Sequence, residues 1–313
     1  MCESINQFGL GCWALGSESY GLVGEETAKE LIECAVNEGI TFFDTAPLYG
    51  NGISETRLGN YLPKSHNLRI ATKVGISNDS HKILRKRLES QHIIDSVNGS
   101  LRRLRSENIF LLQLHSPELH FESDELFSTL NLLQKSGKVS NIGISLKMPD
   151  FLPLQDKLFS WNSFQYNCSI LDQRIAKFSD LVEVKNKLGI YMIARTPLNF
   201  GFLGNKAPDI INLPEKHHLQ NWPQPQLQQW IRRREQVLDI IAPTGLSILE
   251  AALRFPLDRG LANMIIPGAT NKHELLENLR LSRSPLPESL VNQLSSQIPD
   301  SVIASSPYTI QEN

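Results

Sequence analysis

Four side chains that can take part in acid–base chemistry stand at or just after the ends of strand-like apolar runs. Asp44 ends one such run, and Tyr49 follows it in a turn rich in Pro and Gly. Two later runs end in Lys73 and His115. Strand ends and the loops after them carry the chemistry of many α/β proteins. We therefore expect a carboxylate, a phenol, an ammonium and an imidazole to meet in one site.

The elements that would position these groups form a regular series. Amphipathic helical patterns, such as residues 25–37 and 91–104, separate strand-like apolar runs. The eight runs are residues 8–13, 40–45, 68–74, 108–115, 140–145, 161–167, 189–196 and 262–269. Eight strand–helix units without a low-complexity linker predict a (β/α)8 TIM barrel of the α/β class rather than an open doubly wound sheet. We expect a single domain over residues 1–313, with its core at about 8–281.

The spacing of the series changes after the seventh run. Residues 198–225 are rich in Pro, Asn and Gly, and residues 230–241 have a helical pattern that ends before Gly245. We expect a long loop and an extra helix here, with the loop covering the substrate. The C-terminal tail, residues 282–313, has one further helical pattern and then a polar end that we expect to be loosely ordered.

The composition argues against several classes of protein. A formal net charge of −2 and 41% hydrophobic residues in 313 are typical of a globular protein without a nucleic-acid or membrane surface. The sequence has neither a signal-peptide pattern nor an apolar run of about 18 residues, so we expect a cytoplasmic protein. The cysteines and histidines lack metal-ligand spacing, so we expect no metal site. The basic run at residues 82–87, with Arg102, Arg103 and Arg105, is expected to form the solvated face of a helix pair.

Three segments carry a resemblance to a known family. Asp44-Thr-Ala-Pro-Leu-Tyr49-Gly, Ala71-Thr-Lys73 and Gln113-Leu-His115 have the order and spacing found in the aldo-keto reductase superfamily, which the chain resembles from about residue 8 to about residue 281. The resemblance implies an oxidoreductase that reduces an aldehyde or ketone, or oxidises the alcohol, by hydride transfer with NAD(P)H. The expected partner is a small carbonyl or alcohol substrate, and the oligomeric state stays open.

The chemistry of that reaction gives each of the four groups a role. Carbonyl reduction creates an alkoxide that needs a proton donor, and a free phenol with a pKa of about 10 is a poor one unless an ammonium is held beside it. Tyr49 fits as the general acid/base, Lys73 as the group that tunes it, and Asp44 as the anchor of Lys73. His115 would donate to the carbonyl oxygen. Taken alone, Asp44 could cap a strand end, Lys73 could reach solvent and His115 could be a core histidine.

The resemblance also implies residues that bind the nicotinamide half of the cofactor. Ser145 and Gln165 would hold the carboxamide, although Leu146 replaces an Asn that the family usually has beside the Ser. Arg195 would stack its guanidinium on the nicotinamide ring. Backbone donors would line the pyrophosphate at three residues: Leu198, Gly201 and Leu203.

The last unit resembles the family's adenosine-phosphate site. It consists of Pro267, Gly268, Thr270, Glu274 and Asn278 at the start of a helix. The family commonly has a basic residue where Thr270 stands and Gln or Arg where Glu274 stands. A carboxylate beside the ribose favours the free 2′-hydroxyl of NAD, whereas the family's habit and the nearby Lys272 favour NADP. Both cofactors therefore stay open.

A short glycine motif admits a different interpretation. Gly9, Gly11 and Ala14 match the relaxed dinucleotide fingerprint, but only a short polar N-terminus precedes them, so we disfavour a Rossmann fold. In the barrel, Gly11 and Trp13 would instead end the first strand and face the cofactor and substrate. The substrate wall would then comprise Trp13, Tyr20, Leu48, His115 and Trp222.

Two other functions stay possible on the same fold. The protein could bind the nucleotide as a catalytically silent sensor or accessory subunit. Lys73 could alternatively form a Schiff base in a lyase or aldolase, which requires a neutral lysine. Asp44 opposes the second alternative because a carboxylate favours the charged form of Lys73.

Overall fold

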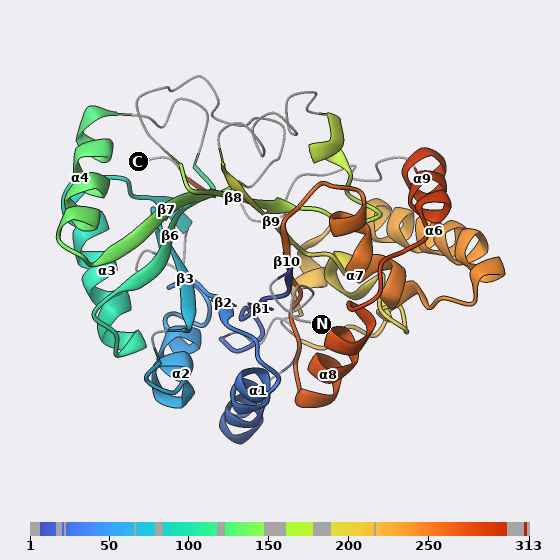
Figure 1. The fold of residues 1–313 in the computed structure, drawn as a ribbon, viewed down its shortest axis with the longest axis horizontal. Coiled ribbons are helices and arrows are strands. Elements are labelled where there is room, and N and C mark those ends of the chain that lie inside the picture. The colour runs from blue at the N-terminus through green and yellow to red at the C-terminus, as the bar shows by residue number, and fades with distance from the viewer. Residues whose placement is uncertain are drawn as a thin grey trace.

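Eight parallel strands form a barrel in the computed structural model, which describes residues 7–16, 21, 23–65, 67–78, 84–117, 123–146, 161–177, 189–215, 217–298 and 310–311. The strands, in their order around the barrel, are β1 Leu10–Gly11, β2 Phe42–Asp44, β3 Arg69–Val74, β6 Ile109–His115, β7 Val139–Ser145, β8 Ser163–Asn167, β9 Tyr191–Arg195 and β10 Met264–Ile266. Parallel bridges from Phe8 to Ile265 and from Gly11 to Gly268 join the last strand to the first. The predicted (β/α)8 barrel is confirmed (Figure 1).

The helices cover the outside of the barrel and begin where the sequence supplies caps. Ser123, Ser247 and Asn271 accept hydrogen bonds from the first turns of three helices, which satisfies backbone donors that have no intrahelical partner. The α-helices are α1 Glu25–Asn37, α2 Ile53–Tyr61, α3 Ser90–Leu104, α4 Asp124–Lys135, α6 Gln224–Ile241, α7 Ile248–Asp258, α8 Lys272–Leu281 and α9 Glu288–Gln297. Short 3-10 turns occur at η2 Arg174–Lys177, η3 Asn199–Gly201, η4 His218–Asn221 and η5 Ala242–Thr244.

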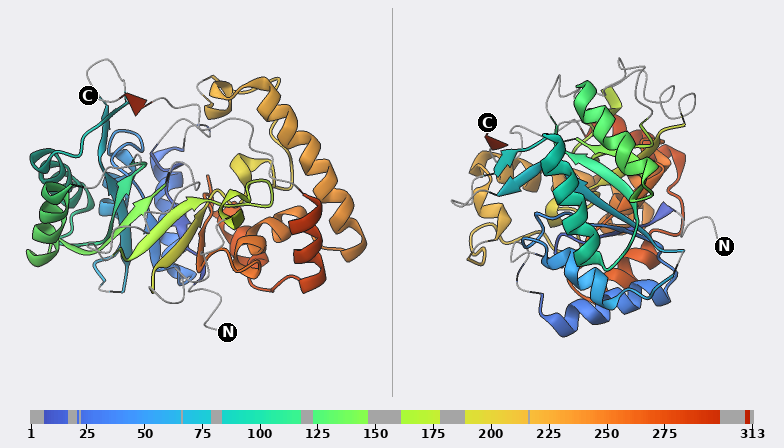
Figure 2. Two further views of the ribbon diagram at one scale, coloured as in Figure 1. Left: turned by 90° about the horizontal axis from the view of Figure 1, so that it is seen from above. Right: turned by 90° about the vertical axis from the view of Figure 1, so that its left-hand side faces the viewer.

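The segment after β9 contains the predicted loop and extra helix. The loop carries η3 and η4, and the extra helix is α6, which starts six residues before the predicted pattern. Helix α6 packs against α9, the helix of the C-terminal tail (Figure 2). Among the described helices, none alone has the length and apolarity of a membrane span; only Gln224–Thr244 taken with Ile248–Asp258, a pair bent by 92°, meets both measures.

A second, three-stranded sheet corrects two expectations. It consists of β4 Ile76–Asn78, β5 Leu84–Lys86 and β11 Ile310–Gln311. Part of the basic run therefore forms a strand instead of a helix, because β5 pairs with β4 on one side and β11 on the other. Residues 310–311, in the tail segment expected to be loosely ordered, pair with β5.

The barrel interior has an apolar layer beneath a polar one. The apolar layer consists of the buried residues Phe42, Ala71, Leu111, Ile193, Met264 and Ile266. Side chains two residues apart in a strand point to the same side, so the next inward positions are Asp44 on β2, Lys73 on β3, Gln113 on β6 and Arg195 on β9. The alternation of the strands thus places the polar groups at the carboxyl end of the barrel, the end where barrel enzymes carry their sites.

Candidate active site

Lys73 connects Asp44 to Tyr49 at the top of the barrel. Its Nζ atom donates to Oδ1 of Asp44 at 2.6 Å, to the carbonyl of Thr45 at 2.8 Å and to the phenol oxygen of Tyr49 at 3.2 Å. Only 1% of Lys73 and 3% of Asp44 is exposed, so water does not screen this ion pair. The ammonium is therefore fixed beside the phenol.

The charge of Lys73 follows from two opposing effects. Burial alone would lower the pKa of Lys73, but the negative charge of Asp44 and the bonds to Asp44 and Tyr49 outweigh burial and raise that pKa above its ordinary value. Lys73 is consequently an ammonium at neutral pH. A neutral amine, which Schiff-base chemistry requires, is disfavoured at this position.

Two buried glutamines hold the other oxygen of Asp44. Oδ2 accepts from Nε2 of Gln113 at 2.9 Å and from Nε2 of Gln165 at 2.7 Å. Sequence reasoning gave Gln113 no role, although its position two residues before His115 places it on the same face of β6. The carboxylate therefore has a hydrogen-bond donor on both oxygens.

His115 lies at the end of β6 and is half-buried. Burial lowers the pKa of His115 well below its usual value, and the positive charges of Lys73 and Arg195 lower it further. The imidazole is therefore neutral at physiological pH. A neutral imidazole keeps one N–H donor.

Arg195 is fixed at the end of β9 by acceptors around its guanidinium. Nε donates to Oδ1 of Asn167 at 2.7 Å, Nη2 donates to the carbonyl of Leu146 at 2.5 Å, and Nη1 donates to Oγ of Ser145. Ser145 in turn donates to Oε1 of Gln165 at 2.8 Å. These in-plane bonds fix the orientation of the guanidinium plane and leave its faces available for stacking.

The loop that carries Tyr49 is held against the loop after β1. A Cβ added at Gly16 would lie 2.2 Å from the carbonyl oxygen of Tyr49, and one added at Gly50 would lie 1.6 Å from the carbonyl oxygen of Gly16. Only glycines permit this approach of two backbones. Oγ of Ser54, in the first turn of α2, donates to the carbonyl of Cys12 at 2.8 Å and ties the same two loops together.

An ion pair between a buried carboxylate and a partly exposed arginine anchors the start of α2. The side chain of Glu55 is fully buried, accepts from Thr72 Oγ1 at 2.7 Å and pairs with Nε of Arg103 at 2.6 Å. Thr72 precedes Lys73 on β3, and Arg103 belongs to α3. Arg103 is therefore an ion-pair partner, which corrects the expectation at this residue, whereas Arg102 and Arg105 are exposed as expected.

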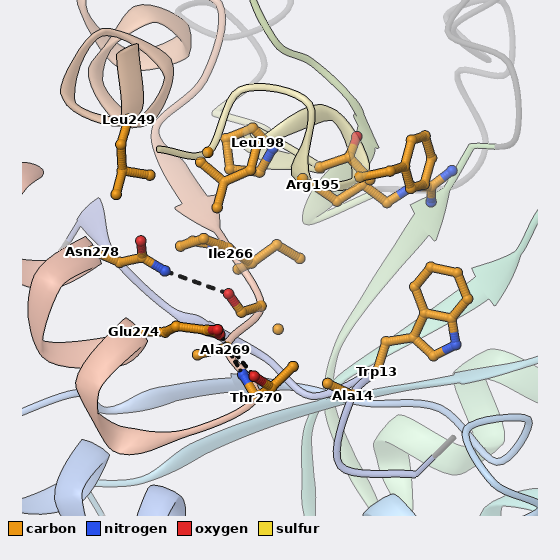
Figure 3. Close-up of a pocket in the computed structure, with 18 of the residues that line it drawn as sticks. Trp13, Ala14, Arg195, Leu198, Leu249, Ile266, Ala269, Thr270, Glu274 and Asn278 are labelled. Atoms are coloured by element: carbon orange, nitrogen blue, oxygen red, sulfur yellow. Dashed lines mark hydrogen bonds between the residues drawn. The ribbon is translucent and has the colours of Figure 1, made fainter. Parts of the chain in front are cut away.

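A cavity of about 550 Å³ begins at Tyr49 and extends to the start of α8. Its lining includes most of the residues that sequence reasoning selected: Gly11, Trp13, Asp44, Tyr49, Arg195, Leu198, Gly201, Pro267, Gly268, Thr270, Glu274 and Asn278. Figure 3 shows Arg195 and Trp13 on one side and Thr270, Glu274 and Asn278 on the other. The described part of the chain thus brings residues predicted to contact the nicotinamide and residues predicted to contact the adenosine phosphate to one cavity.

Several predicted residues do not line this cavity. Ser145, Gln165 and Leu203 are fully buried behind it, and Leu48 is half-buried outside it. Lys73 and His115 also lie outside the cavity lining. Tyr20 lies outside the described residues.

An aromatic cluster, formed by Trp13, Phe200, His218, Trp222 and Trp230, stands beside the cavity. The ring of His218 lies 5.2 Å from that of Trp13 and 5.4 Å from that of Phe200. Trp222 packs against Phe200 and Trp230, is 8% exposed and is not part of the cavity lining, so it supports the expected substrate wall from behind. Sequence reasoning gave no role to His218, because a histidine in a long loop has no periodic pattern that places it.

The end of the cavity at α8 is acidic. Oε2 of Glu274 accepts from the backbone N–H of Thr270 at 2.8 Å and from its hydroxyl at 3.0 Å. Glu277 also lines the cavity, and its carboxylate accepts from Asn205 at 3.0 Å. Nζ of Lys272 lies 3.0 Å from a carboxylate oxygen of Glu30 on α1, and Lys272 does not line the cavity.

Known proteins resemble this chain over nearly its whole length. Probable aldo-keto reductase 1 of Glycine max is 25% identical over 309 residues, covering 97% of this chain and 88% of that protein. Aldo-keto reductase YhdN of Bacillus subtilis (strain 168) is 26% identical over 278 residues, covering 86% of this chain and 83% of that protein. A glycerol dehydrogenase structure from Gluconobacter oxydans shares the fold, with a TM-score of 0.78, 24% identity and coverage of 95% of this chain and 94% of that one. Since residues 7–298 match the Aldo/keto reductase family, the chain belongs to that family.

Proposed function

We propose that this oxidoreductase reduces an aldehyde or ketone, or oxidises the corresponding alcohol, with Tyr49 as the proton donor and acceptor. The observation that carries the proposal is the placement of the Lys73 ammonium 3.2 Å from the phenol oxygen and 2.6 Å from Asp44. A fixed positive charge beside the phenol stabilises the phenolate that proton transfer leaves behind. Tyr49 also lines the cavity, so a substrate oxygen can reach it.

The cavity fits the nicotinamide nucleotide that aldo-keto reductases use. Its volume of about 550 Å³ lies within the range of small-molecule and cofactor sites. Arg195 presents a flat guanidinium at one end, while the other end opens on the first turn of α8, where backbone N–H groups favour anions. When bound, the nucleotide supplies the hydride or receives it. The same arrangement supports cofactor roles for Leu198, Gly201, Gly268 and Asn278.

The residues of the chain then perform the proton chemistry. Tyr49 donates its proton to the substrate oxygen, and Lys73 stabilises the phenolate that is left. Asp44 keeps Lys73 in place and charged. His115 lies outside the cavity lining but close enough for the charges of Lys73 and Arg195 to lower its pKa, and as a neutral imidazole it would donate a hydrogen bond to the same substrate oxygen without competing for the proton.

We propose NADH as the preferred cofactor because of the acidic end of the cavity. Glu274 holds its carboxylate at Thr270, and Glu277 adds a second negative charge to the lining. The ion pair with Glu30 occupies Lys272, which would otherwise favour a 2′-phosphate, and the two carboxylates outnumber the one lysine of the cavity lining, Lys206. Two carboxylates repel that phosphate, whereas a free 2′-hydroxyl can donate to one of them.

The Tyr49→Phe variant tests the proposed reaction. The parent protein and the variant are titrated with NADH and NADPH by fluorescence and assayed against a panel of aldehydes and ketones. Turnover should fall by about 100-fold or more, the typical contribution of a general acid, while the cofactor affinity changes less than about twofold. The control is Tyr61→Phe, because Tyr61 is a phenol on α2 that donates to Glu25 away from the cavity.

Three outcomes would contradict the proposal. Turnover of Tyr49→Phe within about tenfold of the parent would place the acid elsewhere. Cofactor binding by the parent without turnover of any carbonyl would indicate a sensor. Borohydride trapping of a substrate on Lys73 would indicate Schiff-base chemistry.

A further inference from the structure

One oxygen of Asp44 is held by two amide groups in the barrel interior. Gln113 on β6 and Gln165 on β8 both donate to Oδ2, while Lys73 donates to Oδ1. Gln113 and Gln165 are both fully buried. The carboxylate is therefore clamped between the ammonium on one side and the amide pair on the other.

The two glutamines differ in what else they contact. Oε1 of Gln165 accepts from Ser145, which itself accepts from Arg195, so Gln165 belongs to a chain of hydrogen bonds that reaches the cavity wall. Gln113 has no such second link: within the described residues its Oε1 atom is buried and lacks a hydrogen-bond partner. Its Asp44 bond is its one side-chain hydrogen bond there.

A buried amide with an unsatisfied acceptor is costly for folding. Leaving such an atom unpaired costs about 1–3 kcal/mol, and an apolar residue at this position would avoid that cost. The apolar layer directly beneath, which includes Leu111 on the same strand, would accommodate one. The position therefore keeps a donor for a reason other than packing. The orientation of the amide follows from the network, since its oxygen would be repelled by the carboxylate.

We propose that Gln113 is a positioning residue, which holds the Asp44 carboxylate so that Oδ1 faces Lys73 and keeps the ammonium at Tyr49. This inference rests on the proposed function, because it gives Gln113 a part in the same proton transfer. Gln113 does not itself line the cavity, and its one side-chain hydrogen bond within the described residues goes to Asp44, so it acts through Asp44.

The consequence reaches Tyr49 through the balance of effects on Lys73. Burial by itself lowers the pKa of Lys73. The negative charge of Asp44 more than offsets this effect of burial. A carboxylate that has lost one of its donors is less well fixed, so its attraction for the ammonium weakens. The effect of burial, which lowers the pKa of Lys73, is then less fully offset. Lys73 then loses its proton at a lower pH, and the alkaline limb of the pH profile for kcat moves to lower pH.

The first test is Gln113→Leu, which removes the donor and replaces the amide with an apolar side chain of similar size. We expect kcat to fall roughly tenfold, the size of one lost hydrogen bond to a charged group, while KM changes less than about twofold. The alkaline limb should move to lower pH. The matched control is Gln173→Leu, because Gln173 is also buried but, in the part of the chain that the structure describes, its amide donates only to the carbonyls of Ile170, Leu294 and Ile298.

The second test is Gln113→Glu, which also serves if Gln113→Leu does not fold. Two carboxyl groups in contact share a proton, and the protonated one can donate to Asp44 as the amide does. Activity should therefore approach that of the parent at acidic pH and fall as the pH rises. A variant whose activity relative to the parent does not depend on pH would overturn the proposal.

A double-mutant cycle separates this inference from the proposed function. The stabilities of Gln113→Leu, Asp44→Asn and the double variant are measured by urea denaturation, which needs no turnover. The double variant should lose less stability than the sum of the single losses. If the parent turns over no carbonyl but the stability losses are still coupled, the proposed reaction is contradicted and the contact between Gln113 and Asp44 is not. If the stability losses are additive, or if Gln113→Leu has an unchanged kcat and pH profile, the positioning role of Gln113 is overturned and the proposed reaction is not.

Discussion

Gly16 lies against the backbone of Tyr49 at a distance that excludes any side chain. A Cβ at Gly16 would approach the Tyr49 carbonyl oxygen to 2.2 Å. The proposed proton donor is thus positioned from two sides: Lys73 binds its phenol oxygen, and the loop after β1 supports its backbone. A precise phenol position requires both contacts.

The Gly16→Ser variant tests this backbone contact. The new side chain forces the two loops apart, so we expect a stability loss of about 1–3 kcal/mol and a fall in kcat of roughly tenfold or more. Gly24→Ser is the control, because nothing lies within 4 Å of a Cβ at Gly24 and serine suits its position before α1. Thermal unfolding and kcat are measured for both variants. Normal kcat in a folded Gly16→Ser protein would show that the contact does not position Tyr49.

The Arg103→Met variant tests the ion pair behind α2. The change leaves the carboxylate of Glu55, which is fully buried, with Thr72 as its remaining partner within the described residues. We expect a loss of roughly 2–3 kcal/mol in the free energy of unfolding, less than a fully buried pair would give because Arg103 is 32% exposed. Arg87→Met removes a pair in which both side chains are exposed, and it should cost under about 1 kcal/mol. Equal losses in the two variants would contradict the structural role of Glu55.

His218 makes part of the stability of the protein depend on pH. Burial lowers its pKa from 6.5 to about 3, and the unfolded chain therefore binds more protons between these values. The resulting stability is fully present above pH 6.5 and is lost as the pH falls, by about 2 kcal/mol at pH 5. Urea denaturation at pH 7 and pH 5 should show a smaller loss in His218→Phe than in the parent or in the control His273→Phe, which changes an exposed histidine. Identical losses in all three proteins would exclude His218 as the cause.

The barrel could be predicted from the sequence because apolar strand-like runs and amphipathic helical patterns are local features that recur at regular spacing. Helix α1 has the bounds of its apolar pattern, Asp44 and His115 end their strands, and Lys73 is the penultimate residue of β3. Strand ends in a parallel barrel face the same way, so their order along the chain was enough to bring these groups together. Arg195 was selected from the family resemblance, and it too ends its strand, β9.

The parts that sequence reasoning missed depend on contacts between distant residues. Gln113 contacts Asp44 across 69 positions, and no local pattern shows which donor reaches the carboxylate. The strand β5 lies in a Lys/Arg-rich run that suits a helix, but its pairing with β4 and β11 overrides that local preference. Trp222 belongs to a long loop whose path is determined by packing on Phe200 and Trp230.

The cofactor preference depends on the charge at Glu274, and two substitutions separate charge from hydrogen bonding. Glu274→Gln keeps an acceptor for Thr270 but removes the negative charge, so the ratio of the Kd for NADPH to that for NADH should fall several-fold. Glu274→Arg adds a cation that can pair with a 2′-phosphate, and the ratio should fall at least about tenfold, with NADPH binding that weakens as salt rises.

Fluorescence titration of both nucleotides measures these ratios without any substrate. Glu288→Arg makes the same change of charge at the exposed start of α9 and should leave the ratio unchanged. A parent that binds NADPH more tightly than NADH would contradict the proposed preference. The ratio of the two Kd values could instead stay constant from the parent through Glu274→Gln to Glu274→Arg. That result would show that the nucleotide's 2′ position lies away from Glu274. Another group of the cavity lining, such as Lys206, would then determine the preference.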